Sequence, residues 1–128
     1  MPITSLLFRE VLRTTTRHLA EKEKQTRAVL RAILRAMGKI ASNREDVVDY
    51  IQKEFGLERN VALESYDSMK RTFNPSGDID DGELRQAVAQ VKKEIGVTAD
   101  TPLDRMVDLS HLRKVQVELA KEKSNRGK

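Results

Sequence analysis

Apolar residues recur at helical spacing across residues 24–41 of this 128-residue chain, and basic residues recur at every fourth position on the other side. An α-helix places residues three and four apart on one face, so the pattern predicts an amphipathic helix. The apolar positions are Val29, Leu30, Ile33, Leu34, Met37 and Ile40, and the basic positions are Arg27, Arg31, Arg35 and Lys39.

A second helix is expected after Asn43, because asparagine favours the N-cap and the first turn, with Glu45 and Asp46, carries the acidic groups that suit a helix start. Gly56 is the expected stop. The predicted buried face consists of Val47, Val48, Ile51 and Phe55.

Two further helices lie on either side of a turn at residues 74–77, where Asn, Pro, Ser and Gly follow one another. The first covers residues 58–73, and the second begins with Asp80 or Asp81 as its cap and closes at Gly96. Their predicted buried residues are Ala62, Tyr66, Met69, Phe73, Leu84, Val88, Val91 and Ile95.

The C-terminal part predicts a short helical turn and a last helix. Thr101 caps the turn, with Pro102 and Asp104 following it, and Ser110 caps the last helix. The residues expected to face inward are Leu103, Met106, Val107, Leu112, Val115 and Leu119.

The beginning of the chain is ambiguous. Residues 5–13 suit a helix, whereas the β-branched residues 14–16 suit a strand. The predicted fold class is therefore all-α, a bundle of about five helices plus a short helical turn. We expect an N-terminal arm or first helix over residues 1–22, a helical domain over 23–120 and a disordered basic tail over 121–128.

Composition narrows the chemistry. Apolar residues make up 38% of the chain and aromatic residues 4%, which favours amphipathic helices over a β-sandwich. The absence of cysteine excludes disulfides, thiol chemistry and cysteine-bound zinc. The net charge is +4, but both signs are interspersed, so nucleic-acid binding is disfavoured. The apolar run at residues 6–8 is too short for a secretory or membrane-spanning segment, so we expect no membrane insertion and a chain that stays where it is made.

Three stretches follow one another along most of the chain: AVLRAILRAMGKIASNREDVVDYIQKEFGL, VALESYDSMKRTFNPSGDIDDGELRQAVAQVKKEIG and TPLDRMVDLSHLRK. Their order and spacing resemble the C-terminal helical segment of ABC-transporter substrate-binding proteins of the NMT1/THI5-like family, which bind alkanesulfonates and thiamine precursors. The positions that stand in the places of family features are residues 15–22, 34–36, Asn43, Tyr66, 77–81 and 108–112.

The resemblance implies a periplasmic parent that captures a small organic solute for import. In the family, the ligand-binding residues lie mainly in two α/β lobes that are missing here, so no ligand-binding residue is carried over and a small organic ligand is expected only in a full-length parent. The resemblance also implies that residues 11–16 correspond to an interior strand, which without its neighbours would turn helical, pair with another copy or fray.

Two charged features allow a functional and a structural interpretation. The stripe Arg27, Arg31, Arg35 and Lys39 would suit phosphate binding, but no aromatic residues interleave with it, which favours a solvated or salt-bridged face. The cluster Gly77, Asp78, Asp80, Asp81, Gly82 and Glu83 lacks EF-hand spacing, which favours a turn with a helix cap over a calcium site.

The remaining candidates also favour structural roles. The carboxylate pairs Glu45–Asp46 and Asp80–Asp81 lie at predicted helix starts, His18 and His111 are expected at the surface, and Tyr50 and Tyr66 are expected to bury their rings. We therefore predict no enzyme, no catalytic or metal-binding residue and no cofactor. The alternative to a part of a solute-binding protein is a free-standing helical interaction module, with self-association as its possible partner mode.

Overall fold

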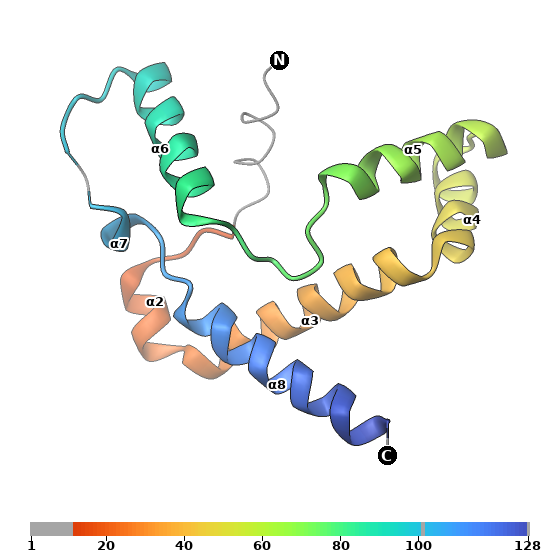
Figure 1. Cartoon of the computed structure of the whole chain (residues 1–128), viewed down its shortest axis with the longest axis horizontal. Helices are drawn as coiled ribbons and strands as arrows, with labels where there is room; N and C mark the ends of the chain where they lie inside the picture. The colour runs from red at the N-terminus through yellow and green to blue at the C-terminus, as the bar shows by residue number, and fades with distance from the viewer. Residues whose placement is uncertain (1–11, 101, 128) are drawn as a thin grey trace.

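The computed structural model describes residues 12–100 and 102–127, and within these residues the chain is all-α, with seven helices and no strand (Figure 1). The predicted helical bundle is thereby confirmed. The helices are α2 (Thr16–Glu21), α3 (Glu23–Ser42), α4 (Arg44–Phe55), α5 (Arg59–Thr72), α6 (Asp81–Ile95), α7 (Leu103–Met106) and α8 (Ser110–Arg126).

The first core lies between α3 and α8, which are distant in sequence. Leu34 of α3 and Leu112 and Val115 of α8 are buried against one another. Four half-buried residues complete this cluster: Leu30, Met37, Leu109 and Leu119. The helical spacing of Leu30, Leu34 and Met37 is the spacing that the sequence assigned to the buried face of α3.

The second core joins the α4–α5 hairpin to the end of α3. Val48, Ala62 and Tyr66 are fully buried in it, and Ile40 of α3 packs against them. Gly56 closes α4 with φ 63° in the left-handed region, as predicted, and the chain then turns directly into α5. The two cores therefore share α3 as their common support.

The start and the end of α6 confirm the predicted caps. The Asp80 carboxylate accepts hydrogen bonds from the amides of Gly82 and Glu83, and Gly96 closes the helix at φ 71°. Leu84, Ala87 and Val88 are buried. In Figure 1, α6 and the α4–α5 hairpin stand apart from each other, toward the left and right of the view, with α3 and α8 below.

Two predicted caps differ from expectation. Asn43 stands at the N-cap position of α4, as predicted, but its side chain makes no cap bond; its amide donates instead to the Lys39 carbonyl of the preceding helix, because α3 and α4 meet at this one residue. At α8 the cap bond moves two residues earlier, since the Asp108 carboxylate accepts from the Ser110 amide at 2.8 Å. Thr101, the third expected cap, lies outside the described residues.

Several residues expected in the core are exposed. Val29, from the predicted apolar face of α3, is 48% exposed, because it lies beside the buried face of this helix rather than on it. Phe55 is 67% exposed and Ile95 66% exposed, because each stands at the last position of its helix, beyond the packed face. Met106 is 48% exposed, since α7 is a single turn that buries none of its residues. The pattern therefore overestimated burial at helix ends.

The two ends of the chain also differ from expectation. Thr15 caps α2 by accepting from the His18 amide, and Thr16 already belongs to the helix, so of the two alternatives left open at the start of the chain, the strand is not formed over residues 14–16. At the other end, α8 continues through Arg126, so the predicted disordered tail is wrong over residues 121–126. The expectation for residues 5–11 lies outside the described residues.

Candidate interaction site at the crossing of α3 and α8

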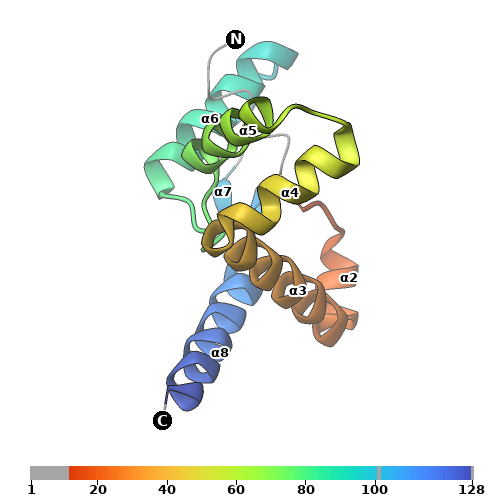
Figure 2. The same cartoon turned by 90° about the vertical axis from the view of Figure 1, so that its right-hand side faces the viewer.

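A row of ion pairs follows the line along which α8 crosses α3 (Figure 2). Lys114 donates to Glu23 at 2.9 Å, Arg27 donates to Glu118 at 3.1 Å, and Arg35 donates to Glu122 at 2.7 Å. Arg31 also donates to Glu118. We call these four contacts the charge ladder.

The charge ladder has a direction. Its α3 members follow one another every fourth residue, and their α8 partners do the same, with residue numbers rising together. The first pair is acid on α3 and base on α8, whereas the later pairs are base on α3 and acid on α8. If α8 ran the other way, Glu122 would face Glu23 and Lys114 would face Arg35, so like charges would repel.

The ladder stabilises the charged form of its carboxylates. The hydrogen bond from Arg31 holds the pKa of Glu118 below its ordinary value, and the hydrogen bond from Arg35 does the same for the pKa of Glu122. The hydrogen bond from Lys114 lowers the pKa of Glu23. These side chains are partly exposed, so solvent screens the pairs and they act mainly on orientation and register.

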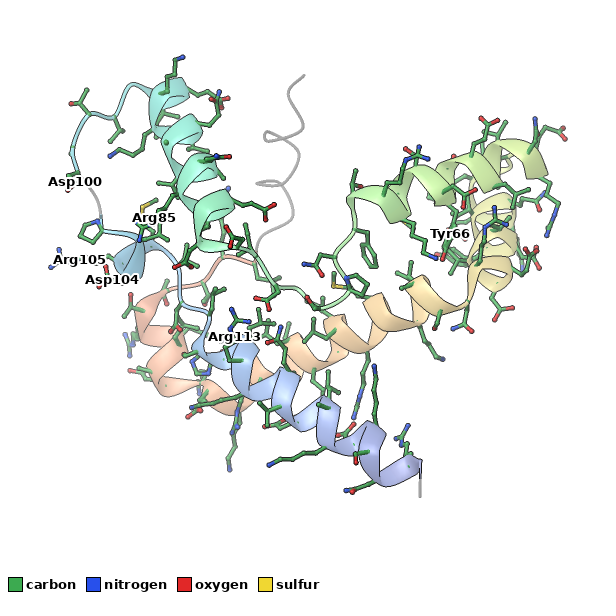
Figure 3. All side chains as sticks on the ribbon, viewed as in Figure 1. Tyr66, Arg85, Asp100, Asp104, Arg105 and Arg113 are labelled. Atoms are coloured by element: carbon green, nitrogen blue, oxygen red, sulfur yellow. The ribbon has the colours of Figure 1, made fainter. Side chains whose placement is uncertain are left out.

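The turn after α5 fastens the other side of α8. The Arg113 guanidinium donates to Asp78 at 2.6 Å, and the Gln116 amide donates to the Ser76 carbonyl at 2.8 Å (Figure 3). Gly77 has φ 70°, and a Cβ built there would lie 3.1 Å from Leu34 Cδ2 and 3.4 Å from Leu112 Cδ1. Glycine therefore lets this turn approach the first core closely.

His111 is buried at this crossing, which corrects the prediction of a surface residue. Its residue surface is 9% exposed, and Nδ1 lies 3.9 Å from the Glu23 carboxylate. Nδ1, Thr26 Oγ1 and Arg27 Nε have no hydrogen-bond partner among the described residues. Glu23 Oε1, which accepts from Lys114, lies 3.8 Å from Arg27 Nε and 3.9 Å from His111 Nδ1, so a carboxylate already faces these two groups.

The predicted basic stripe is salt-bridged, as expected. Arg27, Arg31 and Arg35 all donate to carboxylates of α8. Three of the four cations of the stripe therefore form ion pairs within the chain. Lys39 lies beyond the end of the ladder and is exposed. This arrangement removes the continuous positive face that phosphate contacts need.

The acidic cluster forms the predicted turn and cap. Asp80 caps α6, and Asp78 pairs with Arg113, whose hydrogen bond lowers the pKa of Asp78. Among the residues described, no group of three or more acidic or histidine side chains is placed to hold a metal ion. Glu45, from the other carboxylate pair, binds Arg59 across the α4–α5 hairpin.

The two tyrosines behave differently. Tyr66 is fully buried, as predicted, with Arg44 and Lys70 at 5.8 and 6.0 Å from its ring centroid. Tyr50 is 60% exposed, because it lies on the side of α4 that turns away from α5, so its predicted burial is wrong. His18 lies half-buried in α2.

An open depression lies at the bend between α2 and α3, lined by residues 20–25, which are neighbours in sequence. None of the described helices is long and apolar enough to cross a membrane.

Sequence reasoning missed the partners of the basic stripe. Glu118 and Glu122 are four residues apart, the spacing that Arg27, Arg31 and Arg35 also have. This matching period was the available signal, and it was overlooked because the two segments lie about ninety residues apart.

Comparison with family models, with curated proteins and with solved structures finds no match to this chain.

Proposed function

We propose that this chain is the C-terminal helical part of a solute-binding protein of the NMT1/THI5-like kind. In such a protein the capture of a small organic solute belongs to α/β lobes, and these helices pack against the lobes. The proposal includes no catalytic step, no cofactor and no metal.

The observation that carries the proposal is the order of helices and turns. A helix begins directly after Asn43, Tyr66 lies within α5, and a turn containing Gly77 separates α5 from α6. The resemblance implies these three features at the same positions, whereas the helix end that it implies at residues 34–36 is not found, because α3 continues to Ser42. The ion pairs between α3 and α8 support the proposal that solute capture belongs to the lobes. These pairs leave few charged groups at the crossing of the two helices to hold a solute.

Reconstitution tests this function. The α/β lobes of an NMT1/THI5-like binding protein, cut before its own helical segment, are mixed with this chain, and solute binding is followed by calorimetry. We expect the mixture to bind solute more tightly than the lobes alone. A mixture that forms no complex, and binds no better than the lobes alone, would contradict the proposal.

The second candidate is a free-standing interaction module, favoured by exposed apolar side chains. Nine large apolar residues are exposed among the described residues: Leu12, Val29, Tyr50, Phe55, Val61, Ile95, Val97, Met106 and Val117. Apolar surface of this kind marks contact sites when it gathers into patches. Sedimentation velocity over a range of concentrations tests this candidate, which predicts association and is contradicted by a monomer throughout.

A further inference from the structure

The charge ladder makes α3 selective for a helix of one sequence pattern in one direction. A docking helix must offer a base opposite Glu23 and, one and two turns later, acids opposite the arginines of α3. Beneath the charges it must offer apolar residues to Leu30, Leu34 and Met37. Lys114, Glu118 and Glu122, with Leu112, Val115 and Leu119, supply both sets on α8.

The contacts that hold α8 are local to this surface. Among the helices, α8 packs chiefly on α3, and outside the helices the turn at residues 76–78 adds Arg113–Asp78 and Gln116–Ser76. All of these partners come from residues 23–78, so one continuous segment of the chain forms the docking surface, or receptor, of α8. Any copy of α8 meets the same receptor on any copy of the chain.

The segment between α6 and α8 is long enough to carry α8 to another copy. It covers residues 96–109, in which α7 is a single turn. An extended segment of this length reaches roughly 45 Å, whereas α8, with 17 residues, is about 25 Å long. The connection can therefore deliver α8 either to its own α3 or to that of a neighbour.

Apolar side chains remain exposed on both helices that an exchange would involve. Val29 of α3 and Val117 of α8, both exposed, lie on the two helices that an exchange would bring together from different copies.

We propose that the α3 surface of the charge ladder is a helix-docking groove whose second occupant is α8 of another copy of this chain. At low concentration the tethered α8 fills its own groove, because its effective concentration there is high. At high concentration two chains exchange α8 and form a reciprocal dimer. This inference does not rest on the solute-binding parentage, and its test is independent of reconstitution with lobes.

The test uses the fact that the chain has no cysteine. R31C and E118C are made in separate chains, one of them carrying a peptide tag that changes its mobility. The two are unfolded, mixed at high concentration, refolded together and treated with a short bismaleimide. Arg31 and Glu118 contact each other, so an adduct between the two chains is expected only if α8 of one docks on α3 of the other.

The matched control is the pair R44C and D67C, which replaces the Arg44–Asp67 contact of the α4–α5 hairpin. The Arg44–Asp67 contact involves neither α3 nor α8, so an exchange of α8 alone leaves it within one chain, and we expect no adduct between copies. Adducts in both pairs, or in neither, would overturn the proposal. The unaltered chain, refolded at high concentration, should sediment as a dimer, and a monomer would overturn the exchange. A dimer without the R31C–E118C adduct would also overturn it, because the exposed apolar residues would then hold the dimer together.

Discussion

The Tyr66 hydroxyl donates a hydrogen bond of 2.7 Å to the Ile40 carbonyl, which lies in the last turn of α3. The carbonyls of a last helical turn have no partner within the helix. Tyr66 belongs to α5 and is fully buried against Val48 of α4, so one side chain joins three helices. This contact fixes the α4–α5 hairpin on α3.

Tyr66→Phe should lower the free energy of unfolding by about 1 kcal/mol, since the buried hydrogen bond is lost while the ring remains. Urea unfolding followed by circular dichroism measures the change. Tyr50→Phe is the matched control, because Tyr50 is exposed, and we expect no change from it. Equal effects at the two positions would mean that the hydroxyl of Tyr66 has no special role.

Gly77→Ala should destabilise the protein more than Gly56→Ala. Gly56 has φ 63° and Gly77 has φ 70°, and this conformation costs a residue with a Cβ about 1–2 kcal/mol. A Cβ on Gly56 meets open space, whereas one on Gly77 also crowds Leu34 and Leu112. Thermal unfolding of the two variants compares them, and an equal loss would show that the close approach at Gly77 is unimportant.

Leu34→Ala should cost about 2–5 kcal/mol, since it opens a cavity in the first core. Val29→Ala, on the exposed side of the same helix, should change stability by less than about 0.5 kcal/mol. Leu34 is buried and Val29 is exposed, so the pair isolates burial within one helix. Chemical unfolding measures both, and a large loss from Val29→Ala would reveal a hidden contact at that face.

Acid should loosen α8 before it unfolds the rest. The pKa values of Glu23, Glu118 and Glu122 are lowered in the folded protein. Their ionised carboxylates therefore stabilise the folded state above the ordinary pKa of about 4.3. This stabilisation is lost as the pH falls through the lower pKa values of the folded state. Hydrogen exchange of α8 amides between pH 6 and about pH 3 follows this loss.

Glu118→Gln removes one titrating member of the ladder and should make α8 less sensitive to acid. Glu64→Gln, on the exposed surface of α5, is the control and should leave the acid dependence unchanged. An acid dependence that is the same in both variants and in the unaltered chain would remove the ladder as its cause.

The local signals in the sequence predicted the helices well. Asp80 and the glycines at 56 and 96 act through bonds and dihedral angles within a few residues of themselves, so their roles can be read from neighbouring positions. The buried positions Leu34, Val48 and Val115 follow from helical spacing in the same way.

What the sequence could not predict depends on contacts between distant elements. Whether Asn43 caps the helix after it or the helix before it is decided by how closely α3 and α4 meet. The burial of His111 and the charge ladder both depend on the crossing of α8 over α3. The four-residue spacing that the arginines of α3 share with the glutamates of α8 permits this pairing, but spacing within a helix does not show which helices pack together.

The most direct test of the account is an equilibrium titration of the isolated chain with alkanesulfonates and pyrimidines, measured by calorimetry. The account places solute capture outside these helices and predicts no tight, saturable binding. Tight uptake of one molecule of solute per chain would contradict it.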